Sequence, residues 1–276
     1  MTSFSSIGDI SSLCQMTALP ICKAFGNIAS LCSMQPVVIF GGSAGDLGEL
    51  LAAYLCFMGV LTISYRTHTK YAAVGRLEMN FLNILYLFIL LTEMGLGIFT
   101  GSTHLVTASL NGGLVAGFFW VLLINGIVPF QALEDGNSFN LWSIFISTSA
   151  ISTATSFLIY GSSKGNLLAS PTTNSPILYA IVIFWPIVSV VVYGILSIVL
   201  VLSKLSQRKT LINLLFAALF AILSASATVV VNNELCMTSM KFVTGAPFGV
   251  VLAFLSFVMV HRYWFSITES SFNSYR

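Results

Sequence analysis

The chain has 276 residues, of which 57% are hydrophobic and only 7% are charged, and its formal net charge is +2. Soluble domains carry about a quarter charged residues, so this composition excludes a soluble globular fold of this size. The small and scattered net charge also argues against a nucleic-acid partner. Membrane lipid is therefore the first expected partner.

The expected amino-terminal segment, residues 1–46, comes before any membrane span. Up to residue 35 its only charged residues are Asp9 and Lys23, and Pro20 interrupts the apolar pattern. A cleaved signal peptide would have a basic start followed by a continuous apolar stretch. Because this segment has neither, we expect the first span to serve as the targeting signal.

Apolar windows near the length of a membrane helix follow one another along the rest of the chain. They cover residues 47–65, 79–100, 105–128, 141–161, 177–202, 211–231 and 247–264. The first window is irregular because Glu49 lies inside it, and the fourth is rich in Ser and Thr. The predicted fold is an all-α polytopic membrane protein, with a seven-helix transmembrane domain over 47–264 and a tail over 265–276.

The distribution of Lys and Arg predicts the orientation, since these residues concentrate in cytoplasmic segments. Seven spans create two alternating sets of loops and ends. One set carries eight of the 11 basic residues and includes the carboxyl terminus, whereas the other carries three and includes the amino terminus. We therefore expect a lumenal amino terminus and a cytoplasmic tail.

Four of the five cysteines fall on the non-cytoplasmic side of this topology. They are Cys14, Cys22, Cys32 and Cys236. Disulfides persist in that compartment, so these four are candidate disulfide residues with three possible pairings. The alternative is that they are small buried apolar residues. Cys56 lies inside the first span.

Three residues inside the spans are candidate contacts with a client protein or between helices. Glu93 in the second span is an ionisable group at a depth where such groups are costly and often functional. Gly113 and Gly117 form a small-xxx-small pair in the third span, and Ala217 and Ala221 form another in the sixth. This spacing lets helix backbones approach closely.

The sequence contains no pattern typical of an enzyme. The stretch 41–46 is rich in glycine but lacks the Lys-Ser/Thr that completes a phosphate-binding loop. There is no HExxH, CxxC or Ser/His/Asp grouping, and His68, His104 and His261 are scattered. The loops are too short for a nucleotide-sugar-binding domain. We expect no catalytic residues, no metal site and no cofactor.

Several stretches resemble the fungal chitin synthase export chaperone family, in the order in which that family has them. They are Leu13–Cys22, Lys70–Glu78, Leu123–Gly126 with the following Phe130-Gln131 and Glu134-Asp135-Gly136, and Tyr263–Thr268. Together they extend over nearly the whole chain. The resemblance implies a seven-span protein of the endoplasmic reticulum membrane that assists folding and exit of a chitin synthase without making chitin.

The resemblance also implies partners and possible contacts. A chitin synthase would be the polytopic client, with Glu134, Asp135, Gly136, Tyr263 and Trp264 as candidate contacts. Vesicle-coat adaptors are a second expected partner of the cytoplasmic elements. Departures such as Ala18 in place of a family proline leave a divergent paralogue with another client open.

Two other functions remain open. One is a seven-span receptor or sensor at the cell surface, which would bind a small ligand or a heterotrimeric G protein. The other is a transporter, whose flux would depend on Glu93.

Overall fold

The computed structural model describes the helical part of the chain and short pieces before it. The described residues are 14, 17, 22, 37–39, 42–44, 47–69, 75–99, 102–130, 138–164, 176–205, 208–231 and 245–273. In chain order the elements are β1 (Val37–Ile39), β2 (Gly42–Ala44), α2 (Leu47–Thr69), α3 (Arg76–Ile98), α4 (Ser102–Ile127), η2 (Val128–Phe130), α5 (Ser138–Lys164), α6 (Pro176–Tyr179), η3 (Ala180–Phe184), α7 (Trp185–Leu200), η4 (Val201–Leu205), α8 (Arg208–Ser226), η5 (Ala227–Val231) and α10 (Ala246–Asn273).

Seven helical segments are long and apolar enough to cross a membrane. They are Leu47–Thr69, Arg76–Ile98, Ser102–Phe130, Phe139–Lys164, Ile177–Ser203, Thr210–Val230 and Ala246–Thr268. Each overlaps one predicted window, so the prediction of an all-α seven-span membrane protein is confirmed. The main difference is at the end of the chain, where α10 continues to Asn273 and therefore runs into the expected tail.

A short antiparallel hairpin precedes the first membrane helix. Strands β1 and β2 pair Val37 with Ala44 and Ile39 with Gly42. The sequence analysis noted only the glycines of the overlapping stretch 41–46 and predicted no strand there. Three residues per strand is at the short end of what strands reach, so periodicity gave little signal for it.

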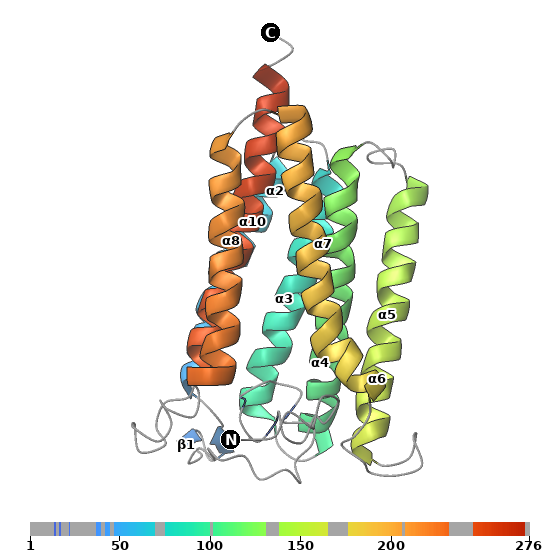
Figure 1. Cartoon of the computed structure of the whole chain (residues 1–276). Helices are drawn as coiled ribbons and strands as arrows, with labels where there is room; N and C mark the ends of the chain where they lie inside the picture. The colour runs from blue at the N-terminus through green and yellow to red at the C-terminus, as the bar shows by residue number, and fades with distance from the viewer. Residues whose placement is uncertain are drawn as a thin grey trace, which may run out of the picture.

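Consecutive membrane helices run in opposite directions and form one bundle (Figure 1). The hairpin and the start of α2 lie at the end opposite the carboxyl end of α10. Helix α8 packs against α10, α10 against α2, α2 against α3, and α3 against α4, which also packs against α5 and α7. Helix α5 lies at the periphery, with its extended contact to α4.

Helix α3 lies at the centre of this arrangement. In its apolar segment 61% of the residues are buried, whereas none of the other six segments exceeds 39%. Its Tyr86 stacks on Phe257 of α10, with ring centroids 4.5 Å apart, and lies 5.6 Å from Phe118 of α4. Lipid tails give little hydrophobic drive for helices to associate, so close packing of this kind holds the bundle together.

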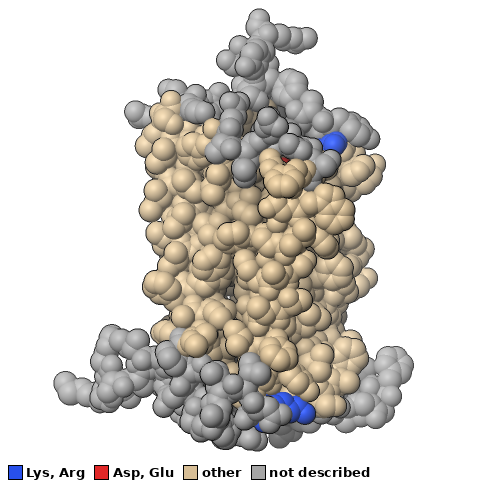
Figure 2. Space-filling model, turned by 90° about the vertical axis from the view of Figure 1, so that its right-hand side faces the viewer, with Lys and Arg blue, Asp and Glu red and all other residues tan. Residues whose placement is uncertain are grey.

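Most of the outer surface is apolar. Large hydrophobic side chains such as Leu55, Ile146, Leu202 and Leu215 are more than 60% exposed. On the face shown in Figure 2, Lys and Arg lie near the two ends and the middle carries no charged side chain. A surface of this kind is stable against hydrocarbon and unstable in water, which agrees with a membrane-spanning bundle.

Pro186 accounts for a local irregularity in the fifth span. It lies in the first turn of α7, directly after the π-helical turn η3. Proline has no N–H to donate to the carbonyl four residues earlier, and its ring crowds that carbonyl. A wider turn before the proline relieves both problems. The helix therefore continues across the membrane without a break.

Candidate functional site

Three of the stretches on which the family resemblance rests meet at one end of the bundle. Gly75 forms the turn before α3, Asn125 and Gly126 lie near the end of α4, and Tyr263 and Trp264 lie on α10. A Cβ built on Gly75 would lie 3.6 Å from Nε1 of Trp264, so the turn and α10 are in contact. We call this region the carboxyl-end junction.

Gly75 has a backbone reason to be glycine. Its φ is +70°, in the left-handed region that residues with a Cβ rarely adopt. Its carbonyl accepts a hydrogen bond from the N–H of Met79 at 2.9 Å, which closes the first turn of α3. The tight turn brings the start of α3 beside Trp264.

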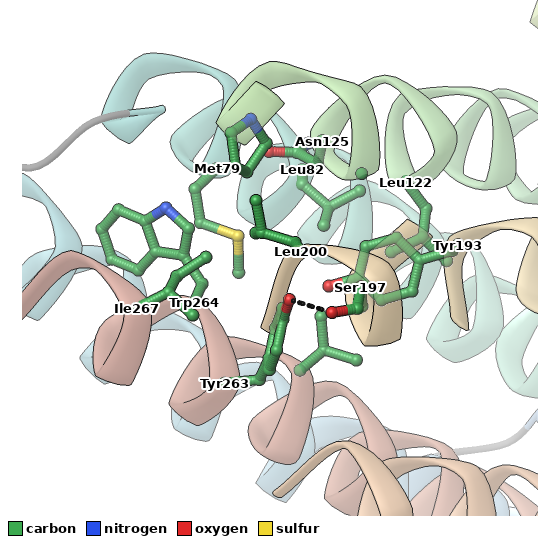
Figure 3. Close-up of a pocket in the computed structure, with 13 residues that line it drawn as sticks. Met79, Leu82, Leu122, Asn125, Tyr193, Ser197, Leu200, Tyr263, Trp264 and Ile267 are labelled. Atoms are coloured by element: carbon green, nitrogen blue, oxygen red, sulfur yellow. Dashed lines mark hydrogen bonds between the residues drawn. The ribbon is translucent and has the colours of Figure 1, made fainter. Parts of the chain in front are cut away.

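The junction encloses a small pocket between α3, α4, α7 and α10 (Figure 3). The Tyr263 hydroxyl donates to the Ser197 carbonyl of α7 at 3.3 Å. Gly126 lets Tyr193 approach α4, since a Cβ there would lie 3.1 Å from the tyrosine ring. The free space is about 10 Å³, room for roughly one water molecule. The pocket is a packed joint, far smaller than sites for small organic ligands.

A buried polar cluster joins α2, α3 and α10 beside this joint. The Thr67 hydroxyl and Nε2 of His261 are 2.9 Å apart, and the Asn83 amide donates to the Thr67 hydroxyl at 3.3 Å. The His261 ring lies 5.6 Å from that of Trp264. The sequence analysis missed this cluster and listed His261 only as scattered. The signal available was Asn83, an amide inside an otherwise apolar window, whereas Thr67 lies beyond the first predicted window and gave none.

Glu93 takes part in a contact between two helices of the bundle. It is 8% exposed and accepts a hydrogen bond from the Asn111 amide of α4 at 3.2 Å. The same amide donates to the Thr92 hydroxyl at 2.9 Å and lies 3.4 Å from the Ile89 carbonyl. In this arrangement Glu93 serves α3–α4 packing. Asn111 was not singled out from the sequence, although it is as unusual in an apolar window as the glutamate.

Gly113 and Gly117 lie in the seam between α4 and α5. A Cβ on Gly113 would collide with the backbone carbonyl of Ser152, and a Cβ on Gly117 would collide with the Ser152 hydroxyl. A Cβ on Gly117 would also lie 3.1 Å from Cγ2 of Thr148. The small-xxx-small pair therefore packs against the hydroxyl-rich face of α5. Both glycines are therefore used for packing between α4 and α5.

A second close seam joins α8 and α10. The Ser224 hydroxyl of α8 donates to the Gly249 carbonyl, and the Ser256 hydroxyl of α10 donates to the Ala217 carbonyl, each at 2.8 Å. Ala217 is 4% exposed. Ala217, the first residue of the small pair predicted in the sixth span, thus faces α10.

The structure joins Cys14 and Cys22 in a disulfide, with Cα atoms 5.2 Å apart. Cys56 is a free buried cysteine in α2. The other candidate disulfide residues, Cys32 and Cys236, lie outside the described residues, as do the candidate contacts Glu134, Asp135 and Gly136. Within the described ranges, no group of three or more His, Cys, Asp or Glu side chains is placed to hold a metal ion.

Comparison with known proteins places this architecture in a family. The family model described as chitin synthase export chaperone matches residues 6–275. The chain belongs to this family. It is similar to the chitin synthase export chaperones of Chaetomium globosum, at 27% identity over 95% of this chain and 82% of the relative, and of Fusarium oxysporum f. sp. lycopersici, at 28% over 96% and 83%.

A third relative gives a similar match. The chitin synthase export chaperone of Cryptococcus neoformans is 26% identical over 95% of this chain and 74% of the relative. No solved structure matches the chain significantly. The resemblance inferred from four short stretches is confirmed by the match over residues 6–275, and the junction contains described residues from three of those stretches.

Proposed function

We propose that this protein is a membrane chaperone that assists the folding of a chitin synthase and its export from the endoplasmic reticulum. The observation that carries the proposal is the family match over residues 6–275, on a chain whose described part consists almost entirely of membrane helices. The curated relatives are named as export chaperones. The protein acts by binding, and makes or breaks no bond in its client.

The packed interior supports binding at the outer surface. Glu93, Gly113 and Gly117 are engaged between helices of the bundle, and the joint at Tyr263 has room for about one water. A substrate pathway through the bundle would need more space than this. A membrane client would instead meet the faces that the helices turn outwards.

We assign the client contact to the outer face of α5. Ser143, Ala150, Thr153 and Ala154 are exposed there, spaced along one side of the helix. Small and hydroxyl residues let a second helix approach closely within a membrane. This face also exposes Ile146 and Phe157, but it differs from α7, whose exposed side chains are all bulky and apolar, such as Ile187, Val191 and Ile195. Helix α7 suits lipid, and α5 suits a transmembrane helix of the synthase.

The orientation completes the proposal. Arg66, Arg76 and Arg262 lie on the end of the bundle that carries the excess of basic residues, which we place in the cytoplasm. The same end holds the carboxyl-end junction and the end of α10. We expect vesicle-coat adaptors to bind cytoplasmic elements, with 134–136 and the end of the tail 265–276 as candidate segments; the start of that tail is packed in the bundle, since Ile267 and Thr268 are 8% exposed.

The test follows a fluorescent chitin synthase in cells with and without this gene. Loss of the gene should retain the synthase in the endoplasmic reticulum and lower cell-wall chitin. Normal arrival of every synthase isoform at the cell surface would contradict the proposal and favour a surface receptor or a different client. Co-purification of the synthase with this protein provides an independent readout.

A pair of matched variants tests the α5 face. Ala150→Trp puts a bulky group on the exposed side of α5, and Val191→Trp does the same on α7. We expect the α5 variant to lose most of the co-purified synthase and the α7 variant to retain it, at equal protein abundance. Equal retention by both variants would move the client contact away from α5.

A further inference from the structure

The Cys14–Cys22 disulfide lies against the end of the bundle that faces away from the junction. Cys14 and Cys22 are bonded, and Thr17 between them is 5% exposed, with its hydroxyl 3.6 Å from the Cys22 sulfur. Cys14 is 2% exposed and belongs to a hydrophobic cluster. The other buried members of this cluster are Leu96 of α3, Ala108 of α4, Ile159 of α5 and Leu178 of α6.

This cluster links the end of α5 and the start of the fifth span, where α6 lies, to α3 and α4. Helix α5 has its extended contact with α4, and α6 is a single turn of four residues. Even so, Ile159 and Leu178 are 0% and 3% exposed, as deeply buried as residues of the central helix. Cys14 is one of the residues that cover them. It therefore contributes directly to the position of the end of α5 and of the start of the fifth span.

We propose that the Cys14–Cys22 loop is a redox-sensitive clasp that fastens the ends of α5 and α6 to α3 and α4. A dithiol reductant opens it by a two-electron exchange: the S–S bond breaks, Cys14 and Cys22 each gain a proton as thiols, and the dithiol becomes a disulfide. The disulfide limits the conformations that residues 14–22 can adopt when they are detached from the cluster. Reduction removes this limit and therefore favours detachment of Cys14 from the cluster. The location of the clasp rests on the proposed lumenal orientation, where disulfides persist.

The first experiment determines the pairing in the untreated full-length protein. Lys23 is the first basic residue, so trypsin releases residues 1–23 with both cysteines, 24–66 with Cys32 and Cys56, and 210–241 with Cys236. We expect to recover peptide 1–23 unlinked to any other peptide, with a mass lower by two hydrogens than the mass of the same peptide after reduction. Recovery of this peptide with free thiols, or joined to either other peptide, would overturn the proposal.

The second experiment measures what the clasp holds. Hydrogen exchange is compared before and after addition of a dithiol to the full chain carrying Cys32→Ala and Cys236→Ala, so that Cys14–Cys22 is the pair reduced. Exchange at 151–164 and 176–184 should accelerate about tenfold to a hundredfold, while 47–69 should not change. Unchanged exchange at the ends of α5 and α6 after complete reduction would overturn the proposal.

Two further variants separate the clasp from general misfolding. Cys56→Ala removes the free cysteine of α2 and should leave the response to the dithiol intact. The Cys14→Ala, Cys22→Ala chain, with Cys32 and Cys236 retained, should show the fast exchange without reductant. If it exchanges as slowly as the oxidised protein, the clasp is refuted independently of whether the protein assists a chitin synthase.

Discussion

Helices α3 and α5 are both apolar membrane helices, but they are held in different ways. In α3, 61% of the apolar segment is buried, and polar side chains reach two neighbours, α2 through Asn83 and α4 through Glu93. In α5 only 28% is buried, and hydroxyl residues pack against glycines of α4. Specific hydrogen bonds secure the central helix, whereas close backbone approach secures the peripheral one.

The comparison explains how one bundle can be both rigid and able to bind. A buried polar group in a membrane has no water to bond, so its protein partners are fixed. A helix held by a seam of small residues depends on complementary shape along that seam. The opposite face of the same helix remains available to bind another protein. Here α3 provides the fixed centre and α5 carries the face that we assign to the client.

The largest expected effect comes from filling the α4–α5 seam. Gly113→Leu places a side chain where the Ser152 carbonyl lies, and should lower the free energy of unfolding by about 3 kcal/mol. The Trp120–Ser147 hydrogen bond crosses the same seam at 3.0 Å, so tryptophan emission should shift as well. Thermal unfolding in detergent measures the loss.

Gly194→Leu is the matched control for this change. Gly194 lies on α7 with no heavy atom within 4 Å of a Cβ built there. The Gly194→Leu variant should retain the wild-type melting temperature within the error of measurement. Equal destabilisation by both variants would mean that the α4–α5 seam is no tighter than an open position, and the comparison would fail.

The next largest effect tests whether hydrogen bonds stabilise the contact between α3 and α4. Asn111→Leu removes the donor to Glu93 and Thr92, and leaves a carboxyl group with one fewer partner in a membrane interior. We expect a loss of about 1–2 kcal/mol, measured by unfolding in detergent with increasing denaturant. A stability equal to that of the wild type would show that shape alone holds α3 against α4.

A smaller loss is expected at the cluster of α2, α3 and α10. Thr67→Val keeps the side-chain shape but removes the hydroxyl shared by Asn83 and His261, and should cost about 1 kcal/mol. Thr62→Val is the control, because the exposed Thr62 hydroxyl donates to the Gly59 carbonyl of its own helix. If both changes cost the same, the cluster contributes nothing beyond helix-internal bonding.

The smallest effect is expected for Glu93→Gln. The glutamine keeps an oxygen that accepts from Asn111, so stability should change by less than about 1 kcal/mol and synthase export should continue. This variant also tests the transporter alternative. Flux of a solute in reconstituted vesicles that Glu93→Gln abolishes would contradict the packing role of this glutamate.

The sequence by itself determined the number and type of the membrane helices. Apolar length is a local property, and a window such as 177–202 must form a helix because lipid offers its backbone no hydrogen-bond partner. The same reasoning placed Glu93, Gly113 and Gly117 inside the membrane. Four short stretches were also enough to indicate the family.

Only the tertiary structure decided which of these residues meet. Thr67 and His261 are 194 positions apart in sequence, and no periodicity within either window relates them. Small-residue spacing on α4 is equally compatible with a client helix or with α5, and packing alone selects α5. Contacts between helices depend on how each helix is rotated and paired, and these are properties of the whole bundle.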